Sequence, residues 1–200
     1  DQLWCDCTID LHDAVLTEFA NFRDATFNRY ADFRGATFNR YADFRDATFN
    51  GYADFRDATF TNADFWGATF NGADFRGATF NGAYFRDATF TNAYFWGATF
   101  TNDANFGGAT FKRDANFWDT TFTSFADFER ATFTNDADFQ DATFSRSAPP
   151  RGLPPGRVDK DGLPHGARWA DADDEGLEAG SPDDAPAEGT GPGSAGSAAS

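Results

Sequence analysis

The chain has 200 residues, no methionine, two cysteines, two histidines and no long apolar run. A membrane-spanning helix needs an apolar stretch of about 18 residues or more, so the sequence predicts no membrane span. It also shows no secretory signal, and we expect a cytoplasmic protein. Because the chain begins at Asp1 and lacks methionine, we expect a fragment or a processed form, with an upstream membrane anchor left open.

The few cysteines and histidines offer little chemistry. Cys5 and Cys7 are two residues apart, and a disulfide between them would close a strained ring. No cluster of Cys and His residues supplies further metal ligands, so we expect both thiols to be reduced and small apolar residues of the first coil. His12 and His165 are isolated in the sequence. With no nucleophile beside a base and no phosphate-binding glycine loop, we predict no enzyme, no cofactor and no metal site.

Acidic residues outnumber basic ones along the whole chain. Residues 1–146 hold 22 acidic and 12 basic side chains, a net charge of −10, and residues 147–200 hold 10 and 4, a net charge of −6. Such a surface repels nucleic acid and attracts basic proteins, so we expect no direct nucleic-acid binding. No phenylalanine follows Phe144. We therefore expect residues 147–200 to form a disordered acidic tail rich in Pro, Gly and Ala.

A repeat of five or six residues fills the chain from Phe22 to Phe144. Each unit has a central large residue, almost always Phe, and an alanine two positions earlier, as in Ala53-Asp54-Phe55. Residues two apart on an extended segment point to the same side, so Ala and Phe are predicted to face the core. Counting from Leu11, there are 26 units, and only Ile9 and Thr120 replace the alanine. A fixed short period of this kind predicts a solenoid.

The repeat resembles that of the pentapeptide-repeat family, and the units that carry the likeness are Ala20-Asn21-Phe22, Ala31-Asp32-Phe33 and Ala63-Asp64-Phe65. The resemblance implies a right-handed quadrilateral β-helix over residues 9–146, with four units per coil and about six coils. Phe centres and alternating Thr units look most like actinobacterial members. We expect residues 1–8, with Trp4, to cap the N-terminal end. Nothing after Phe144 looks like a cap, so we expect the C-terminal end to stack on a second copy.

Turns in this repeat need residues that tolerate left-handed backbone angles. We assign that role to Gly and Asn before the next alanine, as at Gly35, Gly67, Gly72, Gly77, Asn62 and Asn92. Some double repeats also carry one extra residue, which changes the period from 10 to 11. We expect these residues to bulge at two opposite corners without disturbing the core. The aromatic ones either cover the corner or form an edge for self-association. The extra residues are Phe19, Tyr30, Tyr41, Tyr52, Asp103, Asp114, Phe125 and Asp136.

On two outward faces, an Asp before the centre is followed by an Arg after it. We predict surface ladders of modest stabilising effect at Asp32/Arg34, Asp43/Arg45, Asp54/Arg56 and Asp74/Arg76. Aromatic residues interrupt these ladders. Tyr94, Trp96 and Trp118 are expected on one face, with Arg76 within cation–π range of Trp96. Tyr84, Trp66 and Arg86 are expected on the opposite face. Exposed Trp and Tyr beside Arg are typical of binding hot spots, so these seven residues are the candidate partner-binding residues.

The function predicted first is a non-catalytic protein-binding or scaffold module of unknown partner, with self-association at an end or an edge left open. The alternative is DNA mimicry, because the resemblance implies that some family members are acidic rods that occupy the DNA site of gyrase. B-DNA carries a charge every ~1.7 Å, so a rod of about 31 Å would need about 18 charges. The predicted rod has a net charge of −10. Flat rows of Thr on the other two faces raise ice binding as a third hypothesis.

Overall fold

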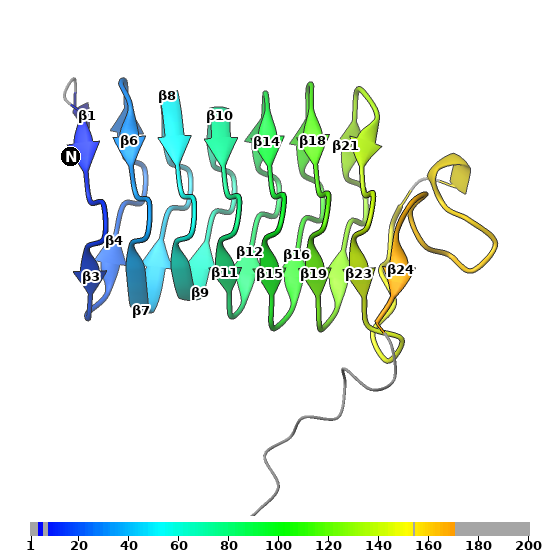
Figure 1. Ribbon diagram of the computed structural model, residues 1–200. Coiled ribbons are helices and arrows are strands. Elements are labelled where there is room, and N and C mark those ends of the chain that lie inside the picture. The colour runs from blue at the N-terminus through cyan, green and yellow to red at the C-terminus, as the bar shows by residue number, and fades with distance from the viewer. Residues whose placement is uncertain (1–3, 6–7, 154, 171–200) are drawn as a thin grey trace, which may run out of the picture. The chain divides into compact units, whose positions relative to one another are not determined.

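The structure is a computed structural model that describes residues 4–5, 8–153 and 155–170. These residues form an all-β solenoid of about seven turns, with one short 3-10 helix, η1 (Pro155–Arg157), and no α-helix among them (Figure 1). No helix in this part of the chain is long and apolar enough to cross a membrane. Each coil has four sides, and each side stacks on the same side of the next coil.

The first sheet contains two columns of parallel strands. In the first column Thr and Phe repeat: β1 (Trp4–Cys5), β5 (Thr26–Phe27), β8 (Thr48–Asp54), β10 (Thr69–Asp74), β13 (Thr89–Phe90), β17 (Thr110–Phe111) and β21 (Thr132–Phe133). In the second column Ala and a polar residue repeat: β2 (Ile9–Asp10), β6 (Ala31–Asp32), β14 (Ala93–Tyr94), β18 (Ala115–Asn116) and β22 (Ala137–Asp138). Strands β8 and β10 turn the corner and belong to both columns.

The second sheet is built in the same way. Its Thr–Phe column is β3 (Val15–Leu16), β7 (Thr37–Asp43), β9 (Thr59–Asp64), β11 (Thr79–Phe80), β15 (Thr99–Phe100), β19 (Thr121–Phe122), β23 (Thr143–Phe144) and β24 (Arg168–Trp169). Its second column adds β4 (Ala20–Asn21), β12 (Ala83–Tyr84), β16 (Ala104–Asn105) and β20 (Ala126–Asp127) to β7 and β9. Four columns of parallel strands confirm the predicted four-sided β-helix.

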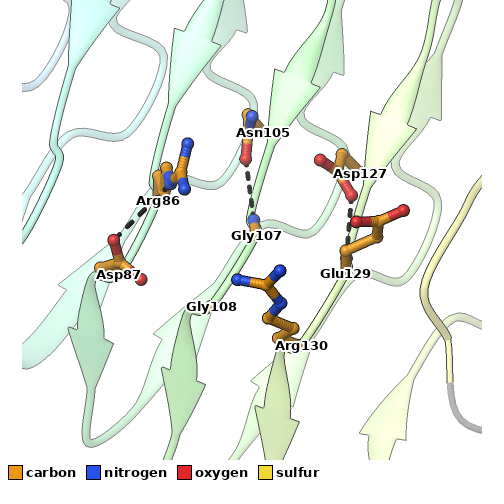
Figure 2. Close-up of a pocket in the computed structure, with 8 residues that line it drawn as sticks. All are labelled: Arg86, Asp87, Asn105, Gly107, Gly108, Asp127, Glu129 and Arg130. Carbon is orange, nitrogen blue, oxygen red and sulfur yellow. Dashed lines mark hydrogen bonds and ion pairs between the residues drawn. The ribbon is translucent and has the colours of Figure 1, made fainter.

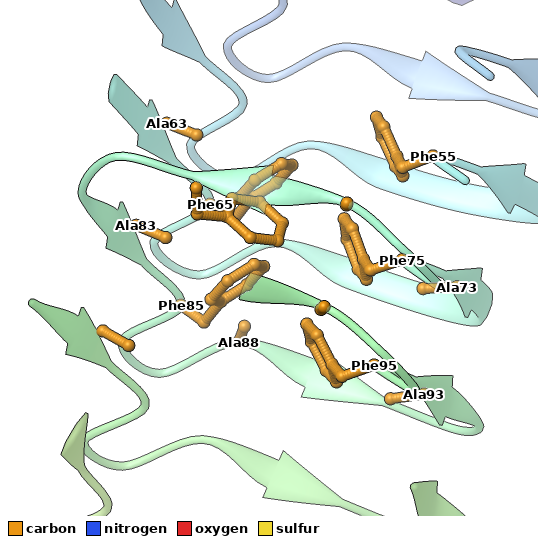
Figure 3. Close-up of a cluster of buried hydrophobic side chains, with 14 of the residues drawn as sticks. Phe55, Ala63, Phe65, Ala73, Phe75, Ala83, Phe85, Ala88, Ala93 and Phe95 are labelled. Atoms are coloured by element: carbon orange, nitrogen blue, oxygen red, sulfur yellow. The ribbon is translucent and has the colours of Figure 1, made fainter. Parts of the chain in front are cut away.

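The core is a stack of phenylalanine rings. In each column Phe pairs with Phe and Ala with Ala, as in Phe70↔Phe90 and Ala73↔Ala93. Rings one coil apart lie parallel, with centroids 4.9 Å apart for Phe55–Phe75, and rings on opposite sides meet edge to face (Figure 3). This edge-to-face and offset-stacked packing suits the quadrupole of the aromatic ring. Thr120, which replaces an alanine, is also buried and donates its hydroxyl to the carbonyl of Phe95.

The extra residues bulge at the corners, as predicted. The strand register shifts between Phe38 and Tyr41 and between Phe70 and Gly72, where the period changes. The Phe19 ring stacks on Tyr41 at one corner, with centroids 5.7 Å apart. At the opposite corner, Tyr30 and Tyr52 stack in the same way. The Phe core beneath remains buried, so the bulge spares the core.

The left-handed turns are made mostly by Asp and Gly. Positive φ angles occur at seven Asp residues, at Arg130 and at glycines that include Gly67 and Gly77. The prediction was correct for Gly35, Gly67 and Gly77 but wrong for Asn62, Gly72 and Asn92, which have no positive φ. An Asp of one coil often lies over a Gly of the next: a Cβ on Gly67 would come within 2.5 Å of the Asp46 carboxylate. Gly is therefore required at such a turn, because the carboxylate of the coil below occupies the space of a Cβ. At other turns Asp adopts the left-handed conformation, which it does more readily than most residues.

The C-terminal end is capped, which corrects the prediction that residues 147–200 are a tail. Residues 148–170, apart from Pro154, fold onto the last coil: β24 pairs with β23, and Leu163 is buried in the core (Figure 1). Single apolar residues, Leu153, Leu163 and Trp169, replace the Phe repeat here. Strands β1 and β24 also lie outside the predicted range, which explains about seven turns where six were expected. Residues 171–200, predicted to be disordered, lie outside the described residues.

The N-terminal end is described only in part. The backbone of β1 pairs with β5, as Trp4↔Thr26 and Cys5↔Phe27. Apart from the backbone of β1 and from Thr8, the predicted cap at residues 1–8 lies outside the described residues, and so do the two thiols predicted to be reduced.

Truncating a central ring tests the core. Phe75 is fully buried between Phe55 and Phe95, so Phe75→Ala should lower the free energy of unfolding by about 3–5 kcal/mol through loss of contacts and a cavity. Phe19→Ala is the matched control, because the Phe19 ring is half exposed. Urea unfolding followed by circular dichroism measures both. Equal, small effects of the two substitutions would contradict a packed phenylalanine core.

The cap makes a separate prediction. Leu163 is 3% exposed, whereas Leu153 is only partly buried. We expect Leu163→Ala to cost about 2 kcal/mol or more and Leu153→Ala clearly less, by the same urea experiment. If Leu163→Ala left the free energy of unfolding unchanged, residues 148–170 would not be a packed cap.

Candidate protein-binding surface

Paired Asp and Arg side chains line two opposite faces of the rod. In each predicted pair the Arg donates to both carboxylate oxygens, for example Arg56 Nε to Asp54 Oδ1 at 2.8 Å and Nη2 to Oδ2 at 2.7 Å. Nε of Arg56 also lies 3.7 Å from Asp74 of the next coil. The pairs are therefore confirmed, but the prediction that they are surface ladders was wrong. Asp54 and Asp74 are 1% and 0% exposed, and their arginines cover them.

The tyrosines of the bulges cover the carboxylates from the corner. The hydroxyl of Tyr30 donates to Asp54, and that of Tyr52 donates to Asp74, at 2.8 Å and 2.7 Å between oxygens. Tyr41 donates to Asp64 on the opposite face. These bonds join residues 22 to 24 positions apart. In the sequence, each of these tyrosines lies about one coil before the aspartate that it bonds. This spacing predicts the hydrogen bond only once the length of a coil is known.

This network shifts the pKa values of its members. Hydrogen bonds from Arg34 hold the pKa of Asp32 below its usual value. Burial alone would raise the pKa of Asp43 and of Asp54, but hydrogen bonds from Arg45 and Arg56 outweigh it, and both pKa values are lowered. Burial, followed by the hydrogen bond to Asp54, raises the pKa of Tyr30 to about 12. The pKa values of the other two bulge tyrosines are raised for the same reasons.

The ladder ends where tyrosine replaces aspartate. Along one column Asp54, Asp74, Tyr94 and Asn116 stack in register. In the coils of Tyr94 and Asn116 the residue after the central Phe is Trp rather than Arg. The two indoles, Trp96 and Trp118, stack with centroids 5.1 Å apart and are 43% and 40% exposed. We call Arg76, Tyr94, Trp96 and Trp118 the Trp96 surface.

Arg76 lies beside this pair but is held by its own aspartate. Its guanidinium donates to Asp74, with Nη2 2.6 Å from Oδ2. The cation–π contacts of the described residues lie at the C-terminal end instead, at Arg146–Trp169, Arg151–Phe125 and Arg157–Phe133. The predicted contact of Arg76 with the Trp96 ring was therefore wrong. Arg76 and Trp96 line one shallow groove, whose glycine floor is Gly77 and Gly97.

The opposite face carries the other three candidates. Tyr84 stacks in register with Asp64 and Asn105, and Trp66 and Tyr84 are 47% and 44% exposed. Trp66 Nε1 donates to Asp87, whose carboxylate also lies 3.6 Å from Arg86. Tyr94 belongs to the first sheet and Tyr84 to the second, so the structure places the candidates on two faces, as predicted.

A small recess lies beside Arg86 (Figure 2). The residue after the central Phe is Trp66 and Arg86 in the two preceding coils of this face, and it is Gly107 in this coil. Since glycine has no side chain, this position is left unfilled. Asn105 accepts a hydrogen bond from the Gly107 amide, and Arg130 and Glu129 line the far side. Sequence reasoning missed the recess, although Gly107-Gly108 is the only Gly-Gly pair in the chain and marked it.

The tyrosine bonds predict a loss of stability at alkaline pH. Tyr30 is neutral in the folded chain, and its pKa rises from the ordinary value of 10.0 to about 12 on folding. Its contribution is therefore complete below about pH 10 and is lost as the pH rises through 12. We expect the free energy of unfolding to fall between about pH 10 and 11.5, measured by urea unfolding. The triple variant Y30F/Y41F/Y52F should show a shallower fall; an unchanged slope would contradict the network.

Comparison with known proteins agrees with the repeat. A family model described as pentapeptide repeats (9 copies) matches residues 8–48, 40–79, 65–110 and 106–149. No curated protein sequence matches the chain. Among solved structures, a trypsin-treated variant of QnrB1, described as a plasmid-mediated fluoroquinolone resistance protein, is 19% identical with a TM-score of 0.33, covering 86% of this chain and 92% of that one. Full-length QnrB1 is 16% identical with a TM-score of 0.34, covering 87% and 95%. The family model spans most of the chain, and the chain belongs to the pentapeptide-repeat family.

Proposed function

We propose that this protein is a non-catalytic protein-binding module whose main contact is the Trp96 surface. The observation that carries the proposal is the exposed stack of Trp96 and Trp118. Water contacts a large part of both indoles, although the fold buries the phenylalanine rings of the same coils completely. Trp is enriched in binding hot spots because it offers a large, rigid area for contact.

The surroundings of the stack suit a protein partner. The groove leaves room at Gly97, where nothing lies within 4 Å of an added Cβ, whereas the Asp57 carboxylate lies over Gly77. Arg76 donates to Asp74 through Nε and Nη2, whereas its Nη1 bonds to no described residue and can donate to a partner. An apolar centre with hydrogen-bond donors at its rim is the usual composition of a protein interface.

Trp66, Tyr84 and Arg86 form a second, smaller candidate contact on the opposite face. The indole N–H of Trp66 donates to Asp87, just as that of Trp118 on the Trp96 surface donates to Asp141. Self-association at the corner of Phe19 and Tyr41 remains a further proposal, supported by the exposed Phe19 ring. The cap removes the reason for expecting copies to stack at the C-terminal end.

DNA mimicry, for example toward gyrase, has weaker support. A DNA mimic needs carboxylates exposed along the rod, as phosphates are along DNA. Here Asp32, Asp43, Asp54 and Asp74 are buried beneath their arginines. If the protein in excess inhibited gyrase supercoiling, and the inhibition survived loss of both tryptophans, this alternative would replace the proposal.

A comparison of matched variants tests the proposed function. The bait proteins are the wild type, W96S/W118S and, as the control on the opposite face, W66S. The lysate should come from an actinobacterium, the source that the Phe-centred repeat predicts. Quantitative mass spectrometry should show at least one protein retained by wild type and W66S and lost from W96S/W118S. All three baits should unfold at similar urea concentrations, because these side chains are partly exposed. Identical protein sets on all baits would contradict the proposal.

A further inference from the structure

The C-terminal cap adds paired residues to only one of the two sheets in the described part of the chain. On the second sheet β24 continues the Thr–Phe column, and Arg151 continues the other column through a bridge to Asp127. On the first sheet, β21 and β22 are the last strands of the described chain, and no strand pairs above them. Leu153 and residues 155–165, which include η1, pass over this end as a loop, and a space remains beneath them.

Backbone groups at this end lack the partners they have in every coil below. Phe95 and Phe117 donate their amides to the carbonyls of Asn116 and Asp138 in the next coil, but the Phe139 amide makes no hydrogen bond with the described residues. In the neighbouring column, the carbonyl of Ala109 accepts from Thr132, whereas that of Ala131 accepts from no described residue. Buried backbone amides are nearly always paired in native proteins, and no described residue supplies a partner for the Phe139 amide.

The space beneath the loop is a cavity of about 360 Å³. Its apolar walls are Phe133, Phe139 and Leu153, and Phe133 is partly exposed although Phe90 and Phe111 below it are fully buried. Ligand-binding cavities have volumes of roughly 300–1,000 Å³ with mostly apolar walls and a few polar groups. The size fits a small organic molecule, and the lining, which is slightly more polar than apolar, suits one that carries a polar group.

The polar groups of the cavity favour an anion. Arg157 lies over the Phe133 ring, with Cζ 5.9 Å from the centroid, and His165 lines the same cavity. The His165 amide donates to the carbonyl of Arg157 and holds the loop in place. Asp136 opposes an anion, since its carboxylate lies 3.2 Å from Arg157 Nη1. That carboxylate is fully exposed, however, so water screens the pair and the other N–H groups of Arg157 remain available.

We propose that the cavity under the C-terminal cap binds a small organic anion with an aromatic or aliphatic body. The apolar part contacts Phe133 and Leu153, and the anionic group accepts hydrogen bonds from Arg157 and from the Phe139 amide. This site is separate from the Trp96 surface, and it does not depend on the proposed function.

Two dyes that differ by one anionic group test this proposal. 8-Anilinonaphthalene-1-sulfonate carries a sulfonate, and N-phenyl-1-naphthylamine is its uncharged analogue. Titration followed by fluorescence should show saturable binding of the sulfonate at one site of the folded wild type. Arg157→Gln should weaken it about tenfold, because a hydrogen bond to a charged group is lost, and should leave the uncharged dye unaffected. Arg40→Gln is the matched control, with the same charge change at an exposed position beside Glu18.

A second measurement locates the dye. In ¹H–¹⁵N spectra the Phe139 amide should shift on addition of the sulfonate, while the amide of Phe75 in the central core should not. The proposal is overturned if the sulfonate does not saturate, if the two arginine variants bind it equally, or if the Phe139 amide stays in place. Thermal unfolding with the dye should show a higher Tm, which distinguishes binding from partial unfolding.

Discussion

The spacing of the phenylalanine rings is the constraint on which the rest of the structure depends. Parallel strands lie about 4.7–4.9 Å apart, and the stacked rings of successive coils lie at nearly the same separation, 4.7 Å for Phe38–Phe60 and 5.1 Å for Phe60–Phe80. One ring per side and per coil therefore satisfies the backbone ladder and the ring stack together. The neighbouring alanine leaves room for the rings, and the outward positions are free to vary without disturbing the core.

The fold follows from the sequence because its rule is local. Ala and Phe two positions apart specify the inward face, and the repeat specifies the coil, so the four columns and the corner bulges were predictable. The burial of Asp54 and Asp74 was not, because it depends on Tyr30 and Tyr52, which lie one coil away in space but more than twenty residues away in sequence. The cap was missed for another reason: Leu163 and Trp169 are isolated apolar residues in a polar segment, and only the folded end of the rod shows where they pack.

The candidate residues were found because they break the repeat. Tyr84 and Tyr94 stand where other coils have aspartate, so Arg86 has no aspartate two residues before it to bind. On the other face, Trp96 and Trp118 stand where earlier coils have arginine. Their faces could be assigned from coil length alone. The stack of the two indoles, the bonding of Arg76 to Asp74 and the recess at Gly107 depend on side-chain geometry that the repeat does not determine. The candidate binding sites of this rod therefore lie where the sequence departs from the repeat and at the end of the first sheet, where no further strand pairs in the described part of the chain.

Residue-resolved hydrogen exchange tests most directly the claim that the stacked rings of the coils and the packed residues of the cap form one core. The amides that connect successive coils, such as those of Phe55, Phe75 and Phe95, should exchange slowly and at similar rates. The amides of Arg168 and Ala170, which bond to the last coil, should also be protected. Rapid exchange at the central phenylalanines, or at Arg168 and Ala170 while the centre stays protected, would contradict this account.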